Sequence, residues 1–144
     1  MKNLFSTTFI MLIAIVLLNG CSASKTAKNT SSALGLTNQV SKNLGLTKDQ
    51  TDAGIGAMMM LSKDKLSADD FSKLTKDIPG ASGLMNKAED LGVIPGSIST
   101  TADILKVLNK LGISPATAAK FIPAVLGAAK TLGGGAFGLL SKVF

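Results

Sequence analysis

Residues 47–65 read TKDQTDAGIGAMMMLSKDK, a helix start followed by an apolar centre. Thr47 and Gln50 have the spacing of a capping box, in which a hydroxyl and an amide satisfy free backbone donors at the start of a helix. The pattern predicts a helix from Asp49 to about Lys65. Neither this stretch nor its neighbours show the apolar and polar alternation of a strand, so the fold class is all-α.

Three consecutive methionines, Met58, Met59 and Met60, lie in this helix. Three successive helical residues sweep about 200° around the axis, whereas one apolar stripe is about 100° wide or somewhat more. One interpretation is a central helix that is buried on two sides. The alternative is an apolar groove for a lipid, an acyl chain or an amphipathic helix, because methionine adapts to varied partners. Gly54 and Gly56 are expected to permit close helix packing.

The remaining helices follow from caps, apolar spacing and glycine or proline stops. We expect a small bundle of about six to seven short helices, with further elements ending before Gly45 and lying over about 67–78, 82–91, 100–111, 115–132 and 136–144. Pro123 lies inside the predicted helix over 115–132 and is expected to kink it.

The chain also contains a weak internal repeat. Residues 44–47 read LGLT and residues 111–114 read LGIS, 67 positions later. We therefore predict two pseudo-repeats of a helix, LG[LI][ST] turn, helix, helix unit, over about 36–91 and 102–144. Each unit is too small to bury its own apolar stripe, so the two should pack together, in one arrangement about a pseudo-two-fold axis. Chance similarity between helices rich in Leu, Gly and Ala is the alternative.

The N-terminus has the organisation of a secretory signal peptide. Lys2 gives a basic start, and residues 9–18 read FIMLIAIVLL, which is shorter than the roughly 20 apolar residues needed to span a bilayer. The run ends in Leu18-Asn19-Gly20-Cys21, which resembles the lipobox of bacterial lipoproteins, with Asn19 as the unusual position. Cys21 is the only cysteine in the chain, so it is the predicted lipidation site.

These features divide the chain into three parts. Residues 1–20 form the signal peptide, residues 21–32 form the lipidated cysteine and a polar, flexible tether, and residues 33–144 form a single helical domain. Lipid on Cys21 would make a membrane the first partner. Ser22 after the cysteine favours the outer membrane facing the periplasm, while the inner membrane and the cell surface stay open.

Composition narrows the function classes. The net charge is +6, and the chain has no histidine or tryptophan; all its basic residues are lysines. Without arginine forks and stacking aromatics, nucleic-acid binding is not expected. Without histidine, imidazole metal sites and Ser-His-Asp catalysis are excluded, and we expect no metal and no cofactor. Asp69 and Asp70 are the one tight carboxylate pair near a helix cap, and adjacent helical residues point about 100° apart.

The C-terminal third allows a second role. In the segment 120–144, lysines alternate with apolar residues, as they do in membrane-surface helices. Lys120, Lys130 and Lys142 would then face phosphates while Phe121, Phe137 and Phe144 enter the acyl region. The alternative is that these apolar residues form the core of the second repeat.

Several motifs together resemble one family of small bacterial proteins, the VcgC/VcgE family of unknown function. They read NLGLT at 43–47, AGIGAM at 53–58, LSADDFSKL at 66–74, IPGA at 78–81, LGIS at 111–114 and FIPAVL at 121–126. The resemblance implies a helical domain of a kind that is often exported, and it brings no catalytic residues.

The sequence therefore predicts a non-enzymatic, lipid-anchored envelope protein with a structural or interaction role, and an envelope protein as its partner. A carrier or assembly factor holding a hydrophobic ligand beside Met58, Met59 and Met60 is the alternative. An envelope hydrolase that uses Asp69 or Asp70 is a weaker one. The oligomeric state is not predicted.

Overall fold

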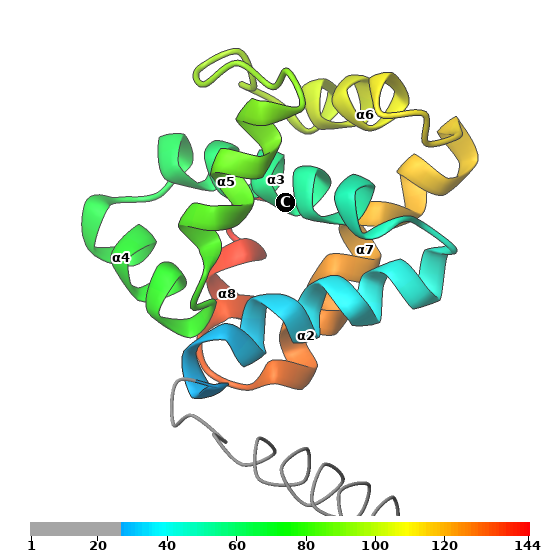
Figure 1. The fold of residues 1–144 in the computed structure, drawn as a ribbon. Coiled ribbons are helices and arrows are strands. Elements are labelled where there is room, and N and C mark those ends of the chain that lie inside the picture. Colours follow the sequence, from blue (N-terminus) through cyan, green and yellow to red (C-terminus); the bar gives the residue numbers. More distant parts are fainter. Residues whose placement is uncertain (1–26) are drawn as a thin grey trace, which may run out of the picture.

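A computed structural model of the protein describes residues 27–144, and their regular structure is entirely helical (Figure 1). This confirms the all-α fold. The helices are α2 (Ala27–Leu44), α3 (Lys48–Lys65), α4 (Ala68–Asp77), α5 (Ala81–Asp90), α6 (Thr101–Lys110), α7 (Pro115–Leu132) and α8 (Ala136–Leu140). Within residues 27–144, no helix is both long and apolar enough to cross a membrane.

Helix α3 lies at the centre of the bundle. Its capping box forms as predicted: Thr47 Oγ1 accepts a hydrogen bond from the Gln50 backbone N–H, and Gln50 Oε1 accepts one from the Thr47 N–H. Every residue from Thr51 to Ser62 is buried. Helices α2, α4, α5 and α6 all contact α3. The helix is therefore enclosed around its whole circumference, which is why it lacks a single apolar stripe.

Two glycines set the distances between α3 and its neighbours. A Cβ atom on Gly56 would overlap the backbone carbonyl of Leu84 in α5. A Cβ atom on Gly54 would overlap the ring of Phe121 in α7 and lie 2.8 Å from a methyl group of Leu108 in α6. The expectation of close helix packing at these two glycines is confirmed. Gly56 allows α3 to approach α5, and Gly54 allows it to approach α6 and α7.

Helix α7 packs against α2 and α8, and like α2 and α3 it has 18 residues. Ser114 caps its start, where its hydroxyl accepts from the Thr117 backbone N–H, and Pro115 occupies the first turn. The helix continues without interruption through Pro123, whose side chain is exposed. Phe121 is completely buried. It belongs to the core, so the expectation that it could enter a membrane is wrong.

The two LG turns have similar local structure. Gly45 and Gly112 both adopt a positive φ, of 66° and 81°, which glycine reaches without steric strain. The helix after each turn has 18 residues, and α7 begins and ends 67 positions after α3 begins and ends. The turns also meet, because Gln50 Nε2 donates to the carbonyl oxygen of Leu111 at 2.9 Å. The wider repeat and its symmetry stay predictions.

The first described helix is longer than the sequence predicts. Helix α2 begins at Ala27 and includes residues 27–32, which composition assigns to a flexible tether. Its buried face starts at Ala33 and continues through Leu36 and Val40. Once packing has formed a helix here, adding residues to its end costs little free energy, so polar residues can extend it.

Candidate functional site

The predicted lipidation site, Cys21 with Leu18, Asn19 and Gly20, lies outside the described residues. The structure shows where the folded domain begins relative to it, since Ala27 is the first residue of α2. Five residues, 22–26, therefore separate the cysteine from the start of a helix that packs into the core.

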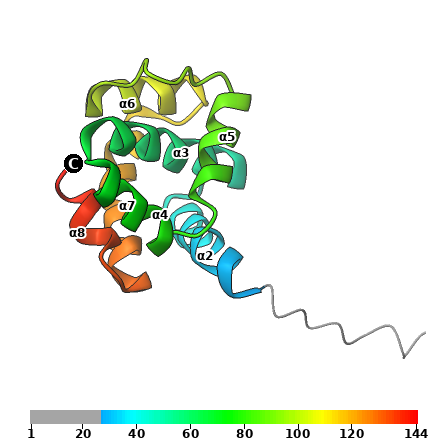
Figure 2. The ribbon, with the colours of Figure 1, turned by 90° about the vertical axis from the view of Figure 1, so that its left-hand side faces the viewer.

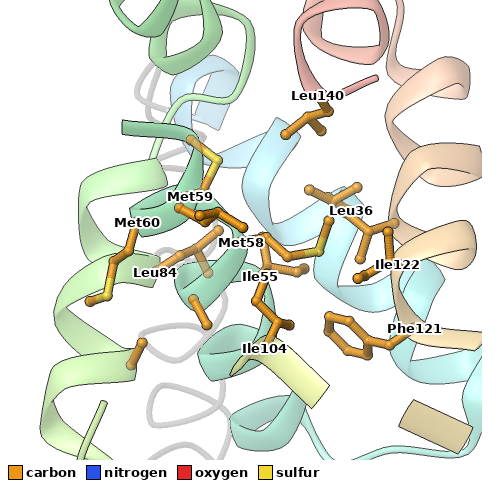
Figure 3. Close-up of a cluster of buried hydrophobic side chains, with 14 of the residues drawn as sticks. Leu36, Ile55, Met58, Met59, Met60, Leu84, Ile104, Phe121, Ile122 and Leu140 are labelled. Atoms are coloured by element: carbon orange, nitrogen blue, oxygen red, sulfur yellow. The ribbon is translucent and has the colours of Figure 1, made fainter. Parts of the chain in front are cut away.

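The predicted apolar groove residues lie in the interior. Met58, Met59 and Met60 are 0%, 1% and 6% exposed. Figure 3 shows Met58 between Ile55 and Leu36, while Met60 points away from Phe121. A ligand could touch Met58 or Met59 only if α3 separated from the helices around it.

Met60 borders a surface pocket. The pocket has a volume of about 220 Å³ and lies between the end of α3 and α5. Its other lining residues are largely polar or charged: Lys63, Asp64, Met85, Asn86, Glu89, Pro95 and Gly96. A small, charged pocket is a poor match for an acyl chain, because ligand sites for apolar groups are lined mostly by apolar side chains.

Asp69 and Asp70 do not form a shared acid–base site. Asp69 is exposed at the start of α4. Asp70 pairs with Lys142 at 3.1 Å and with Lys73 at 3.6 Å. The hydrogen bond from Lys142 holds the pKa of Asp70 below its ordinary value of 3.8, which keeps this carboxyl group ionised. A general acid at neutral pH needs the opposite shift.

A cavity with a volume of about 580 Å³ lies between α4 and α8. Asp70 and Lys142 are on its wall, and the other lining residues are Lys73, Lys76, Asp77, Gly135, Gly138 and Leu139. Asp77 accepts a hydrogen bond from the Gly135 backbone N–H at 2.8 Å, which ties α4 to the turn before α8. These ionic and hydrogen-bonded contacts hold two elements together across a wide, open cleft.

Sequence reasoning missed one buried polar site. Asp52 is only 6% exposed, and it accepts from Thr37 Oγ1 at 2.7 Å and from Lys48 Nζ at 2.6 Å. Both carboxylate oxygens are therefore bonded. Asp49 lies three positions before Asp52. Its carboxylate does not join this site but pairs with Lys87 of α5 at 3.0 Å. An aspartate within a buried helix signals a polar partner, but the sequence does not show that α2 supplies it.

The described part of the chain contains no cluster of side chains arranged as a metal site. Within residues 27–144, no group of three or more His, Cys, Asp or Glu side chains lies close enough to hold a metal ion.

The all-helical bundle places the chain in a class of small helical domains. A family model described as "Protein of unknown function VcgC/VcgE (DUF2780)" matches residues 18–140, and the chain belongs to this family. No curated protein and no solved structure matches it.

Proposed function

We propose that this chain is a lipid-anchored bacterial envelope lipoprotein whose helical domain has a non-enzymatic structural or interaction role. The observation that carries the proposal is Leu18-Asn19-Gly20-Cys21 directly after the apolar run of residues 9–18.

A membrane-anchored domain of this kind needs a stable fold and a surface for partners. In residues 27–144, the enclosure of α3 by other helices supports a stable fold. Four large apolar side chains are exposed, at Leu34, Leu91, Ile94 and Phe137, and they are candidate contacts for a membrane or a partner. Two or three acyl chains on Cys21 would make the anchoring effectively permanent, since a single chain binds a bilayer only marginally.

Fatty-acid labelling in a bacterium that expresses the full chain tests the anchor. Cells are fed an alkyne-bearing fatty acid, and the purified protein is coupled to a dye and weighed by mass spectrometry. We expect label and an acylated mature chain that starts at Cys21. A Cys21→Ala variant should carry no label, whereas Ser22→Ala should be labelled like the wild type. A wild-type chain without label, or with a free thiol at Cys21, would overturn the proposal.

The carrier alternative requires a conformational change that the anchor proposal does not. Met58 and Met59 are completely enclosed, so α3 would have to move away from its neighbours to bind a ligand there. Native mass spectrometry of the full chain in detergent separates the two. A lipid retained beyond the covalently attached acyl groups would favour a carrier.

A further inference from the structure

Three segments that are distant in sequence meet beside the start of α2. A Cβ atom on Gly80, in the turn between α4 and α5, would lie 3.1 Å from the Cβ of Ala33. Asp77, at the end of α4, holds Gly135 in the turn between α7 and α8. Figures 1 and 2 place the start of α2 and this second turn at one end of the molecule, with α6 at the other.

We call the surface at this end the anchor-side face. It consists of the N-terminal half of α2, the α4–α5 turn at residues 78–80, the α7–α8 turn at residues 133–135, and the residues that flank these turns.

The anchor-side face presents apolar and basic side chains together. Leu34 is 39% exposed and Phe137 is 38% exposed. Lys130 Nζ lies 5.8 Å from the centre of the Phe137 ring, and Lys76 is exposed at the end of α4. An aromatic ring next to a lysine suits a membrane surface, because the ring can enter the apolar boundary while the ammonium group stays among the phosphates.

Chain length keeps this face close to any lipid on Cys21. The six steps along the chain from Cys21 to Ala27 span at most about 20 Å, even when the chain is fully extended. A domain of about this size has a radius of gyration of about 13 Å, hence a diameter of roughly 34 Å if spherical. The connection is therefore shorter than the domain is wide. A lipid on Cys21 would thus hold the anchor-side face near the bilayer, and the α6 end could not reach the bilayer instead.

We propose that the anchor-side face rests on the phosphate headgroups of the bilayer that holds Cys21, with Phe137 at the acyl boundary and Lys130 at the phosphates. The inference rests on the proposed lipid anchor. Anchoring keeps the face at a high effective concentration near the bilayer, so a weak surface interaction is enough for docking. The opposite end, with α6 and the loop that carries Ile94, then points away from the membrane.

Labelled single-cysteine variants of the full, lipidated chain test the orientation. Phe137→Cys and Ile94→Cys place a thiol at each end, and acylation blocks the sulfur of Cys21. Both positions are exposed, 38% and 68%, so the fold should tolerate them. Each variant is coupled to a nitrobenzoxadiazole dye and inserted into phosphatidylethanolamine–phosphatidylglycerol vesicles, with or without lipids that carry a nitroxide near the headgroup.

We expect the label at position 137 to shift its emission to the blue and to be quenched by the nitroxide lipid, and the label at position 94 to show neither effect. Lys130→Glu should reduce the quenching at position 137, and Lys110→Glu at the α6 end should leave it unchanged. Equal, water-like emission from both labels, in a chain shown to be acylated, would overturn docking while the lipid anchor stands. Dye coupling to the wild-type chain would instead show a free Cys21 and contradict the anchor itself.

Discussion

A Cβ atom on Gly56 would overlap the carbonyl oxygen of Leu84, a backbone atom of α5 that cannot move without its helix. Gly56→Ala should therefore lower the free energy of unfolding by about 1–3 kcal/mol, because overpacking forces backbone shifts. Gly127→Ala is the matched control, since Gly127 lies on the exposed face of α7 with open space around it. This control should stabilise the protein by about 0.5–1 kcal/mol. Urea unfolding measures both, and equal effects would contradict the close packing.

Thr37 and Asp52 form the buried polar contact between α2 and α3. Thr37→Val keeps the side-chain shape but leaves one carboxylate oxygen of Asp52 without its partner. We expect a loss of roughly 1–3 kcal/mol in the free energy of unfolding, the usual cost of an unsatisfied buried group. Thr75→Val removes only a hydroxyl that bonds within its own helix, and should change stability by less than about 0.5 kcal/mol. A Thr37→Val variant as stable as the wild type would show that the contact is not important.

Asp103 gives a pH prediction at the same scale. Hydrogen bonds from Lys106, Thr100 and the Ser99 backbone lower its pKa from 3.8 to about 2, with Lys106 as the main cause. Because the folded pKa is depressed, the stability from this carboxylate is fully present above pH 3.8 and is lost as the pH falls through about 2. Carbon-13 NMR of the carboxyl group should show a midpoint near 2, and Lys106→Gln should raise it. A wild-type midpoint near 3.8 would exclude these bonds in solution.

At the scale of helices, capping residues predicted most of the starts. Thr47, Ser67, Thr100 and Ser114 each accept from a backbone N–H three residues ahead. These signals are local, so the sequence alone reveals them. The length of α2 was not predictable from the sequence, because its first turns lack apolar residues at helical spacing. These turns are helical because they continue the later part of α2, which packs against other helices. The partner of Asp52 depends on tertiary packing in the same way.

The two caps that follow the LG turns should be equivalent. Thr47→Ala and Ser114→Ala each leave a helix start without its side-chain acceptor, and each should cost about 1 kcal/mol of unfolding free energy. Ser82→Ala is the control, because Ser82 is an exposed residue inside α5 and alanine favours helices. Thermal unfolding at one fixed pH compares the three. A cost at Thr47 without one at Ser114 would contradict the local correspondence of the turns.

At the scale of the whole molecule, the three consecutive methionines are a sequence pattern that favours an enclosed helix. Residues that sweep about 200° of a helix can all be buried only if neighbours cover several sides, and α3 has neighbours on every side. The cleft between α4 and α8 could not be predicted, since its walls come from segments far apart in sequence. The anchor-side face is a similar case, because only the fold brings Phe137 to the end where α2 starts.

The enclosure of α3 also determines how fast the methionines of this helix are oxidised. A dissolved oxidant can reach the sulfur atoms of Met58 and Met59, 0% and 1% exposed, only when the bundle opens. Half-buried Met85 should become a sulfoxide much earlier under mild peroxide, as peptide mass spectrometry can measure. Oxidation at similar rates would mean that the bundle opens often. Sulfoxide is polar and disrupts cores, so a molecule oxidised at Met58 cannot close to the same packing. Sulfoxide at these two positions would thus be a lasting record of past unfolding.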